Sequence, residues 1–458
     1  MIKPSLPQGT RDFAPQVVRR RQHILRTIAS VFEAHGFQPL ETPAMENLDT
    51  LLGKYGDEGD KLIFRILNNG LDNPAKRNQS LEAFEQVLNG QGSKALTERA
   101  LRYDLTIPFA RFVAMNHGQL SFPFKRYQMQ PVWRADRPQK GRYREFWQCD
   151  ADVVGSASLF NEAELIMIYR EAFQKLGIAV DVKINNRKIL AALAESCNAS
   201  DKMTDITVAI DKLDKIGIDK VMDELAQRGL DNDDREKIKN YLQIDGSTDQ
   251  KIDRIEQLLG HTESGKQGIL ELRWLADFLR DEKGDYPFSI DFTLARGLNY
   301  YTGTILEVKS LDVRMGSIGG GGRYDDLTGL FGVPGIPGVG VSFGVDRIYD
   351  VMEESGAFPD SISMGTKVLF FNLGQEESKY AWAAMQQLRA AGISCEIYPE
   401  AVKFDRQFKY AEKKGIPAVV IAGTEEMSKG LYRIKVLASG TQSECDLQGL
   451  KNLLDSGV

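Results

Sequence analysis

Apolar residues repeat with a helical period in some stretches of this chain and with a strand period in others. Between Pro15 and Ala34 apolar residues form a helical stripe at Val17, Leu25, Ile28 and Phe32, which predicts a helix that begins at Pro15 and ends near Gly36. After Glu145 the period becomes two, which predicts a strand with one apolar and one polar face. Residues 124–155 therefore predict two strands joined by a long loop.

The two faces of the strand after Glu145 differ in chemistry. The apolar face suits a hydrophobic core and contains Trp147, Cys149, Ala151 and Val153. The opposite face contains Gln148, Asp150 and Asp152. Because a row of acidic side chains is unfavourable in a core, we expect this face to line a pocket for a cationic ligand that donates hydrogen bonds.

Two stretches in the first quarter of the chain predict further strands. The segment GFQPLETPAME joins extended residues to Pro39 and Pro43, and prolines in strands belong at sheet edges. It therefore fits either a dimer interface or a plain surface connection. Residues 101–106 alternate in polarity, which predicts a strand with an inward carboxylate. The side chains expected on one side of that strand are Arg102, Asp104 and Thr106.

The rest of the chain predicts an inserted loop, a helical region and a mixed region. Residues 68–98 predict an inserted loop with one short helix at 81–88. Residues 187–284 are charge-dense with helical patterning, which predicts a separate all-helical insertion. After a linker at 354–366, strand-like and helix-like segments alternate to residue 458, which predicts a compact α/β domain with parallel strands.

Composition mainly excludes classes of protein. The 458 residues are 42% hydrophobic and 27% charged, as in soluble globular proteins, and this length predicts two to four domains. The four Cys form no CxxC pair and the four His form no HxxxH or HExxH pair, so we expect no metal held by protein ligands alone. The N-terminus lacks an apolar signal segment, and no run of about 18 apolar residues occurs. We therefore expect a cytoplasmic protein without membrane spans.

One segment has a charge opposite to that of the whole chain. From Phe124 to Arg144 there are two Lys and five Arg against the single Asp136, a local balance of +6 in a chain of net charge −6. Guanidinium groups bind phosphate oxygens through paired hydrogen bonds, which ammonium groups do not. Beside the acidic row of the next strand, this loop fits a site for ATP and an amino acid, although a solvent-exposed hairpin would carry the same charges.

Residues 289–332 add two features that can bind a ligand. Arg296 precedes Gly297, and a glycine lets a ligand approach the backbone closely. The pair Tyr300 and Tyr301 fits either the core or a site that uses one free hydroxyl. The four glycines at 319–322 either expose bare backbone to a flat ring or form a turn between strands.

Arg347 is predicted in or near the first turn of a helix that follows a glycine-spaced strand. A cation at that end of a helix opposes the helix dipole. The placement is explained if an anion such as a nucleotide phosphate arrives at the same helix end. The structural alternative is an ion pair of Arg347 with Asp346 or Glu353.

Together these stretches resemble the class II aminoacyl-tRNA synthetases, and specifically the histidyl-tRNA synthetase family. The resemblance covers most of the chain, and its combination of motifs is highly specific. The matching stretches are PQGTRDF, GFQPLETPAME, FKRYQMQPVWRADRPQKGRYREFWQCDADVVG, LARGLNYYTG, GGGGRYDDLTGLFG and GVGVSFGVDRI.

The resemblance implies an α+β fold and a homodimer. The fold would contain an antiparallel class II synthetase catalytic sheet of six or more strands with flanking helices, a helical insertion domain and a C-terminal α/β anticodon-binding domain. The implied domains are residues 1–186 for the first part of the catalytic domain, 187–285 for the insertion, 286–355 for the second catalytic part and 366–458 for the anticodon-binding domain.

The resemblance also implies roles for arginines in the binding of ATP. Arg134 would bind the α-phosphate, Arg347 would lie on the γ-phosphate side, and Arg142 would lie near the phosphates. Arg296 would neutralise the charge that develops on the α-phosphate as the histidine carboxylate attacks. The implied catalytic residues are therefore Arg296, Arg134 and Arg347.

Other residues would bind histidine and tRNA. Those implied to orient the amino and carboxylate groups of histidine are Gln148, Asp104 and Thr106. Asp152 and Tyr301 would hydrogen-bond the imidazole, and Tyr300 and Arg296 would complete the histidine site. The residues implied to meet the tRNA acceptor end are Arg137 and Gln139, at the tip of the arginine-rich loop.

The implied function is that of a histidine–tRNA ligase. Such an enzyme activates L-histidine with ATP and Mg²⁺ to histidyl-adenylate and pyrophosphate, then transfers histidine to the 3' end of tRNA(His). The alternative is the non-catalytic regulatory paralogue of ATP phosphoribosyltransferase in histidine biosynthesis, which shares the catalytic fold. That paralogue would not be expected to keep both Arg134 and Arg347 or a complete C-terminal domain, and this chain has both. An amide ligase on the same fold would not explain the C-terminal domain.

Overall fold

The computed structural model describes residues 3–52, 61–295, 300–359, 362 and 365–455. The chain divides into two compact units, one of residues 1–12 and 21–357 and the other of residues 13–20 and 358–458. Each unit is described by itself. Among the described residues, no helix has the length and apolar character that a membrane span requires.

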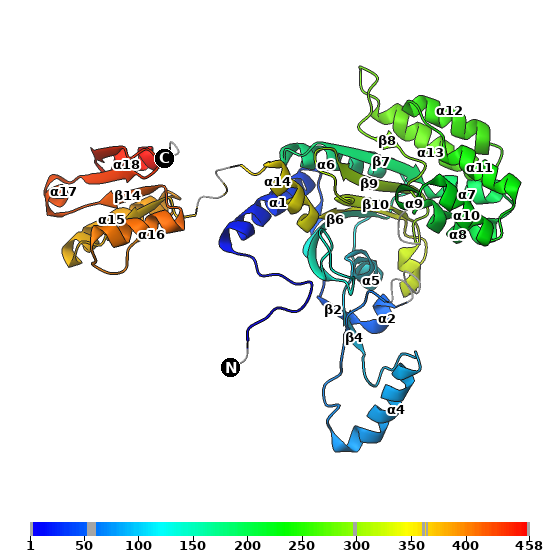
Figure 1. Cartoon of the computed structure of the whole chain (residues 1–458), viewed down its shortest axis with the longest axis horizontal. Helices are drawn as coiled ribbons and strands as arrows, with labels where there is room; N and C mark the ends of the chain where they lie inside the picture. Colours follow the sequence, from blue (N-terminus) through cyan, green and yellow to red (C-terminus); the bar gives the residue numbers. More distant parts are fainter. Residues whose placement is uncertain (1–2, 53–60, 296–299, 360–361, 363–364, 456–458) are drawn as a thin grey trace. The chain divides into compact units, whose positions relative to one another are not determined.

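An eight-stranded sheet forms the centre of the first unit (Figure 1). Its strands are, in spatial order, β1 (Gln38–Pro39), β5 (Phe124–Trp133), β6 (Glu145–Val154), β11 (Gly338–Gly344), β10 (Gly319–Tyr324), β9 (Thr304–Ser310), β7 (Val180–Asn186) and β8 (Ser289–Ile290). The strands from β5 to β7 pair antiparallel, whereas the end pairs β1–β5 and β7–β8 are parallel. This confirms the predicted α+β fold with an antiparallel sheet. Pro39 lies in an edge strand, as its missing N–H requires.

The predicted hairpin is formed by β5 and β6, with Phe124 opposite Val154. Its apolar row faces the core, because Cys149, Ala151 and Val153 are fully buried. Two helices pack on the sheet, α1 (Pro15–Ala34) and α6 (Phe160–Lys175). Both reach Phe343 of β11, which lies 5.7 Å from the Phe32 ring and 5.4 Å from the Phe173 ring, measured between centroids.

The strand predicted over residues 101–106 is wrong in its extent. Strand β4 (Arg99–Leu101) ends there, and helix α5 (Thr106–Asn116) begins at Thr106. Asp104 accepts a hydrogen bond from the Ile107 N–H at the start of that helix, at 3.4 Å. Arg102 donates to the carbonyl oxygens of Thr42 and Pro131. The alternating polarity of this segment resembles that of a strand. It instead reflects buried Arg102, which is hydrogen-bonded to backbone carbonyl groups, and Asp104, which accepts a hydrogen bond at the start of the helix.

A three-stranded sheet of β2 (Met45–Asn47), β4 and β3 (Arg65–Ile66) lies beside this segment, with the short helix α2 (Leu48–Leu51). The inserted loop between β3 and β4 contains η1 (Pro74–Lys76) and α4 (Arg77–Leu88). One helix was predicted here, and it begins four residues earlier than expected. Two further elements complete the first unit around the main sheet, η3 (Leu327–Phe331) and α14 (Val345–Ser355).

The region after β7 is helical, as predicted. It contains α7 (Arg187–Ser196), η2 (Ser200–Lys202), α8 (Met203–Ile210), α9 (Leu213–Ile216), α10 (Ile218–Gln227), α11 (Asn232–Leu242), α12 (Thr248–Leu259) and α13 (Glu263–Leu279). Figure 1 shows these helices gathered near the β7–β8 end of the sheet, where α13 contacts β7 and α12 contacts β8. The exact boundaries of the four expected domains remain a prediction.

The second unit contains a five-stranded sheet in the order β13 (Cys395–Ile397), β12 (Val368–Phe370), β14 (Ala418–Ile421), β15 (Tyr432–Val436) and β16 (Gln442–Cys445). Its helices are α15 (Gln375–Ala390), α16 (Phe404–Lys414), α17 (Thr424–Lys429) and α18 (Leu447–Asp455). The α/β character is as predicted, but only β13, β12 and β14 are parallel. β15 and β16 are antiparallel, because the connections that precede them are shorter than a parallel crossover needs.

Candidate active site

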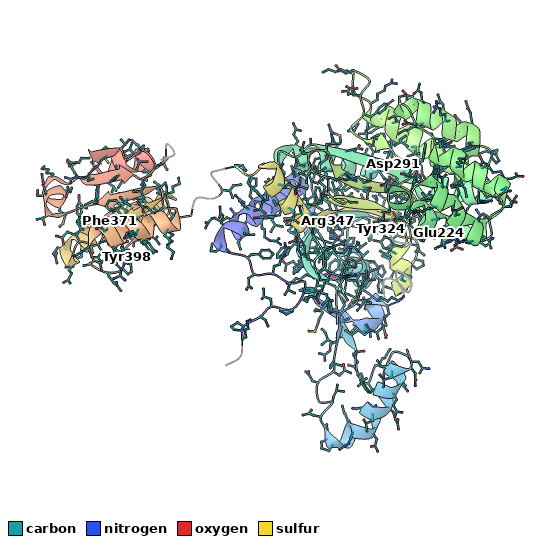
Figure 2. All side chains as sticks on the ribbon, viewed as in Figure 1. Glu224, Asp291, Tyr324, Arg347, Phe371 and Tyr398 are labelled. Atoms are coloured by element: carbon teal, nitrogen blue, oxygen red, sulfur yellow. The ribbon has the colours of Figure 1, made fainter. Side chains whose placement is uncertain are left out.

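A cavity of about 300 Å³ opens on the polar face of the β5–β6 hairpin. Segments that lie far apart in the sequence contribute to its wall: the start of α5, the hairpin loop, β6, Tyr300 and Tyr301, β10, and the junction of β11 with α14. Eight of the predicted site residues line it, namely Asp104, Thr106, Arg134, Arg142, Gln148, Tyr300, Tyr301 and Arg347. Arg347, at the start of α14, is labelled in Figure 2. Arg296 lies outside the described residues.

Backbone carbonyl groups orient two of the cavity arginines. Arg134 donates from Nε to the Tyr103 carbonyl oxygen at 2.8 Å, and its guanidinium lies over the Phe146 ring at 5.2 Å. Arg347 donates from Nε to the Gly141 carbonyl oxygen at 2.7 Å and from Nη1 to the Ser317 carbonyl oxygen at 2.6 Å. A carbonyl oxygen is neutral, so it orients a guanidinium group without cancelling its charge. Arg134 and Arg347 therefore keep their positive charge at the cavity.

The carboxylate beside Arg347 in the sequence has its own partners. Asp346 is buried in the first turn of α14 and forms ion pairs with Arg11 and with Arg21, the latter at 2.6 Å. Its Oδ2 accepts the Trp147 N–H at 2.9 Å. These bonds tie α14 to the start of β6 and to the N-terminal segment. They therefore fix the helix turn from which Arg347 extends.

Acidic and amide groups form the floor of the cavity. Gln148 donates from Nε2 to the Ser342 hydroxyl at 2.8 Å. Gln148 Oε1 and Asp150 Oδ1 are buried and have no hydrogen-bond partner among the described residues. Burial raises the pKa of Asp150 to about 7, against the charge of Arg126, and raises that of Asp104 to about 7, against the charge of Arg134. A ligand that supplies N–H donors or a positive charge would favour the ionised form of both acids.

Asp152, predicted to bind an imidazole, lies behind this floor and does not contribute to the cavity wall. Its Oδ1 accepts the Tyr324 hydroxyl at 2.5 Å, and Oδ2 lies 2.8 Å from Arg126 Nη2 as an ion pair outside hydrogen-bond geometry. Asp152 and Arg126 are 2% and 0% exposed. Burial raises the pKa of Asp152, and the Arg126 charge opposes that shift. Both oxygens are thus already next to protein donors.

The glycine run 319–322 forms strand β10, so the alternative of a turn is wrong. Gly319 and Gly320 line the cavity. A Cβ atom on Gly321 would lie 2.2 Å from the Gly340 carbonyl oxygen, so the neighbouring strand leaves no room for a side chain there. The run therefore allows close strand packing and also presents backbone to the cavity. Whether a ring lies against that backbone stays a prediction.

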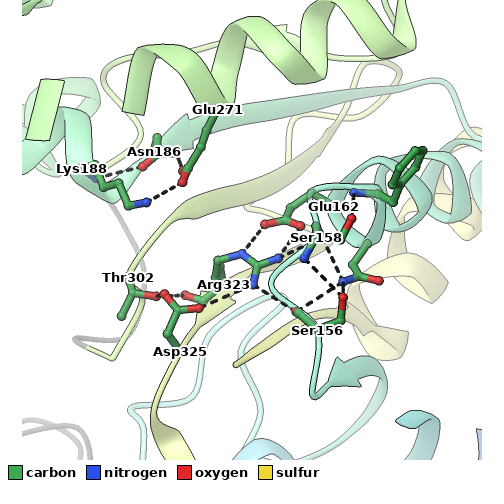
Figure 3. A network of polar contacts seen from close by, with 11 residues as sticks. Ser156, Ser158, Glu162, Asn186, Lys188, Glu271, Thr302, Arg323 and Asp325 are labelled. Atoms are coloured by element: carbon green, nitrogen blue, oxygen red, sulfur yellow. Dashed lines mark hydrogen bonds and ion pairs between the residues drawn. The ribbon is translucent and has the colours of Figure 1, made fainter. Parts of the chain in front are cut away.

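Arg323, at the end of the glycine strand, has a structural role (Figure 3). It donates from Nε and Nη2 to the two carboxylate oxygens of buried Glu162 on α6, at 2.5 and 2.7 Å. Asp325 joins this network and accepts the Thr302 hydroxyl at 2.5 Å. The network fixes β10 against α6 and also holds the residue that follows Tyr301. We call these residues, Glu162, Arg323, Asp325 and Thr302, the Glu162 network.

The loop tip lies outside the cavity wall. Gln139 and Arg142 form a tight backbone bridge, with N–H to carbonyl distances of 3.1 and 2.9 Å, and Gly141 turns the chain with φ of +71°. Arg137 and Gln139 are exposed. Arg142 is held near Asp136, with Nη1 3.7 Å from Oδ1. Arg142 is also exposed but lines the cavity, whereas Arg137 lies outside the wall and is accessible to a large partner.

Sequence reasoning missed several residues of the wall. Those with side chains are Asp136, Tyr143, Phe146, Ser317, Ile318, Ser342 and Asp346. Ser342 lies opposite Asp150 in the β6–β11 register, and such a register cannot be read from local patterns. Asp150 was recognised as part of a polar row but was given no role of its own.

Comparison with known proteins identifies relatives over nearly the whole chain. A family model described as histidyl-tRNA synthetase matches residues 9–78 and 91–348, and one described as anticodon binding domain matches residues 367–456. Curated relatives named histidine–tRNA ligase include one from Christiangramia forsetii, 50% identical over 99% of both chains. Another, from Flavobacterium johnsoniae, is 49% identical over 99% of both chains.

Solved structures resemble the chain as well. A histidyl-tRNA synthetase from Nostoc sp. PCC 7120 superposes with a TM-score of 0.84 at 33% identity, over 100% of both chains. A protein from Bacillus halodurans C, described as an ATP phosphoribosyltransferase regulatory subunit/histidyl-tRNA synthetase, has a TM-score of 0.71 at 21% identity. It covers 89% of this chain and 97% of its own, and that likeness concerns the fold alone.

Proposed function

The chain belongs to the histidyl-tRNA synthetase family, and from that premise we propose that its cavity joins histidine to the α-phosphate of ATP. The chain is an aminoacyl-tRNA synthetase, a ligase that charges tRNA with histidine. One observation carries the proposal for the cavity: arginines from the hairpin loop and from α14 line the same wall as the carboxyl groups of Asp104 and Asp150. Such a wall suits a polyphosphate beside an amino acid.

The arginines would bind ATP. In this proposal Arg134 contacts the α-phosphate, Arg347 the γ-phosphate side, and Arg142 the phosphates between them. Mg²⁺ would enter with ATP, since it binds through substrate phosphates, waters and one or two carboxylates. Asp136, a wall carboxylate beside Arg142, can supply one such oxygen. When bound, Mg²⁺ would neutralise part of the phosphate charge.

The proposed reaction needs no nucleophile from the protein. An oxygen of the histidine carboxylate attacks the α-phosphorus in line, the bond to the bridging oxygen breaks, and pyrophosphate leaves with its electron pair. Catalysis then rests on positioning and on stabilising the developing charge. Arg134 and Arg347 would do this from the described part of the cavity. Arg296, which lies outside the described residues, is proposed as a third such group.

Histidine would be held by the polar floor. Asp104 and Thr106 lie at the start of α5, where they would bind the ammonium group, and Gln148 would orient the carboxylate. Tyr300 and Tyr301 pack edge to face, with centroids 4.8 Å apart, and both line the cavity. They would enclose the imidazole. A site with unmet buried polar atoms rejects amino acids that cannot pair them.

The second half of the reaction needs the tRNA. Arg137 and Gln139 are exposed at the loop tip and are proposed to meet the acceptor end. The match of residues 367–456 to an anticodon-binding model supports a second tRNA contact there. A homodimer and a cytoplasmic location are also proposed. The edge strand β1, short and proline-containing beside α1, supports a subunit contact at that edge.

The regulatory paralogue is the weaker candidate. The structural similarity to the Bacillus halodurans C protein concerns only the fold. Two curated relatives that are about half identical to this chain over nearly its full length are named histidine–tRNA ligase. Pyrophosphate exchange with purified protein, tested against all twenty amino acids, decides between them. We expect labelled pyrophosphate to enter ATP with histidine alone. No exchange with any amino acid would favour the paralogue, and exchange with a different amino acid would contradict the proposed histidine site.

A further inference from the structure

Two backbone carbonyl oxygens from different loops orient the Arg347 guanidinium at the cavity. One belongs to Gly141 in the hairpin loop and lies 2.7 Å from Nε, and the other belongs to Ser317 and lies 2.6 Å from Nη1. Ser317 lies near the end of the loop between β9 and β10 and lines the cavity. The direction of the Arg347 side chain therefore depends on how firmly the protein holds Ser317.

A buried carboxyl group holds Ser317 through its side chain. The Ser317 hydroxyl donates to Glu307 Oε1, and Glu307 on β9 is 6% exposed. The residue after Ser317 is held by backbone, because the Ile318 N–H donates to the Val308 carbonyl oxygen at 2.9 Å. A hydrogen bond to a carboxylate is about twice as strong as one between neutral groups. Ser317 is thus held through its hydroxyl, while its carbonyl oxygen accepts from Arg347.

Glu307 itself lies at a well-supported position of the main sheet. Its cross-strand partners are Gly320 on β10 and Lys183 on β7, so a strand flanks it on each side. Its second carboxylate oxygen, Oε2, lies 3.6 Å from the Lys309 ammonium, which in turn lies 3.5 Å from Asp214 on α9 of the helical region. These contacts hold the carboxylate from the side opposite to Ser317.

The bonds from Glu307 reach Arg347 indirectly, through a hydroxyl and a neutral carbonyl oxygen. A neutral acceptor orients a guanidinium group without cancelling its charge, whereas a carboxylate in direct contact would compete with phosphate oxygens for the same donors. An acid placed one residue away can therefore fix the direction of Arg347 and leave its charge for a ligand.

We propose that Glu307 is a positioning residue for the triphosphate of ATP and acts on Arg347 through Ser317. This inference rests on the proposed function, in which Arg347 binds the γ-phosphate side. It assigns a role to an acid that lies on β9, outside the cavity wall formed by the described residues.

The test compares the KM values of the two substrates of pyrophosphate exchange. In Glu307→Ala and in Ser317→Ala we expect the KM for ATP to rise about 10-fold, as for one weakened charged contact, while the KM for histidine stays within about twofold of wild type. Glu307→Gln keeps an acceptor for the Ser317 hydroxyl, so its KM for ATP should stay within about threefold of wild type. A KM does not depend on the fraction of a variant that is folded, so a merely structural role would lower only the apparent kcat.

A double variant tests the path of the effect. If Glu307 acts through the Ser317 hydroxyl, Glu307→Ala should raise the KM for ATP by less than about twofold in a Ser317→Ala background. Asp181→Ala is the matched control, because Asp181 accepts the Ser289 hydroxyl at 2.7 Å in the same kind of contact but does not line the cavity. Its KM for ATP should equal that of wild type.

A wild-type KM for ATP in Ser317→Ala would overturn the proposal, and so would effects that multiply in the double variant or an equal rise of both KM values. Ser317→Ala keeps the backbone carbonyl group and the buried carboxylate, so it tests the proposal even where Glu307→Ala does not fold. If wild type showed no exchange with histidine, the proposed function itself would fail, and that result is distinct from the others.

Discussion

Two buried acids of the first unit, Glu162 and Asp150, show how this fold uses a carboxylate for different ends. Burial raises the pKa of both. Glu162 has both oxygens bonded to Arg323, as Figure 3 shows, whereas Asp150 Oδ1 has no partner in the described structure. The first arrangement is complete in the protein itself and holds β10 to α6. The second becomes complete when a ligand donates to it.

The comparison teaches that burial and charge alone do not mark a functional residue. The cavity differs in two respects. It contains buried acceptor oxygens without a hydrogen-bond partner in the described structure, and it contains arginines that are oriented by backbone carbonyl groups. Variants should therefore separate into two classes, those that lose activity while staying folded and those that lose stability while staying active.

Arg134→Ala should have the largest effect. Arg134 is oriented by a carbonyl oxygen and an aromatic ring, and no salt bridge holds it, so its loss breaks no ion pair among the described residues. We expect kcat for pyrophosphate exchange to fall about 1,000-fold, as for the loss of a group that stabilises transferred phosphate. The melting temperature should change little. A large loss of stability with normal activity per folded molecule would place Arg134 in the structural class.

Glu162→Ala should give the opposite result. Removing Glu162 leaves the buried Arg323 guanidinium with only its longer pairing to the partly exposed Asp325, and we expect a loss of about 3 kcal/mol in the free energy of unfolding. Exchange activity at low temperature should stay near that of wild type. The matched control is Glu164→Ala on the same helix, whose pairing with Lys125 is partly exposed and should contribute about 0.5 kcal/mol. Equal losses of unfolding free energy in the two variants would mean that the buried Glu162–Arg323 ion pair stabilises the fold no more than the partly exposed one.

The pH dependence of stability should sharpen the contrast. The folded pKa of Asp150 is raised to about 7 from 3.8, so the folded state binds more protons than the unfolded state between these values. Stability from this group is therefore present at pH 4 and falls as the pH rises to 7. The groups that face it are Arg126, Arg134, Asp104, Asp152 and Ser342.

Asp150→Asn removes this titration. Relative to wild type, the variant should gain about 2 kcal/mol in the free energy of unfolding between pH 5 and pH 8, measured by urea denaturation without substrate. For wild type we expect the KM for histidine to fall as the pH rises through 7. In Asp150→Asn this fall should be smaller. A stability difference between variant and wild type that is the same at both pH values would contradict the raised pKa.

Arg137→Ala should have the smallest effect and should be confined to one half-reaction. The side chain is exposed at the loop tip, outside the cavity wall. We expect aminoacylation of tRNA(His) to fall about 10-fold, as for one lost charged contact, with pyrophosphate exchange unchanged. Equal losses in both assays would refute a role at the acceptor end. Lys140→Ala, on the same loop and paired with Glu354, is the control.

Local patterns predicted the hairpin, its two faces and the helical region, because each depends on a period that neighbouring residues reveal. The start of α5 was missed because Asp104 and Thr106 alternate with apolar residues as a strand would, while the helix is set by a hydrogen bond to Asp104. The extent of β10 was missed because glycines give no period. Its position follows from tight packing against β11, which only the three-dimensional arrangement supplies.

The site was predicted in the same uneven way. Arginines that bind an anion stand out by local charge, and Arg134, Arg142 and Arg347 all line the cavity. The difference between Asp150 and Asp152 could not be predicted, since it depends on cross-strand partners. Arg126 and Gly340 flank one acid, and Gln128 and Ser342 flank the other.

The most direct test of the account is the binding of an unreactive histidyl-adenylate mimic, a histidyl sulfamoyl adenosine, followed by isothermal titration calorimetry. The mimic spans the arginine side and the acidic floor at once. We predict one tight site per chain in wild type, weakened at least 10-fold in both Arg134→Ala and Asp150→Ala, and unchanged in Glu164→Ala. Wild-type affinity in both cavity variants would contradict the claim that these two groups share one ligand.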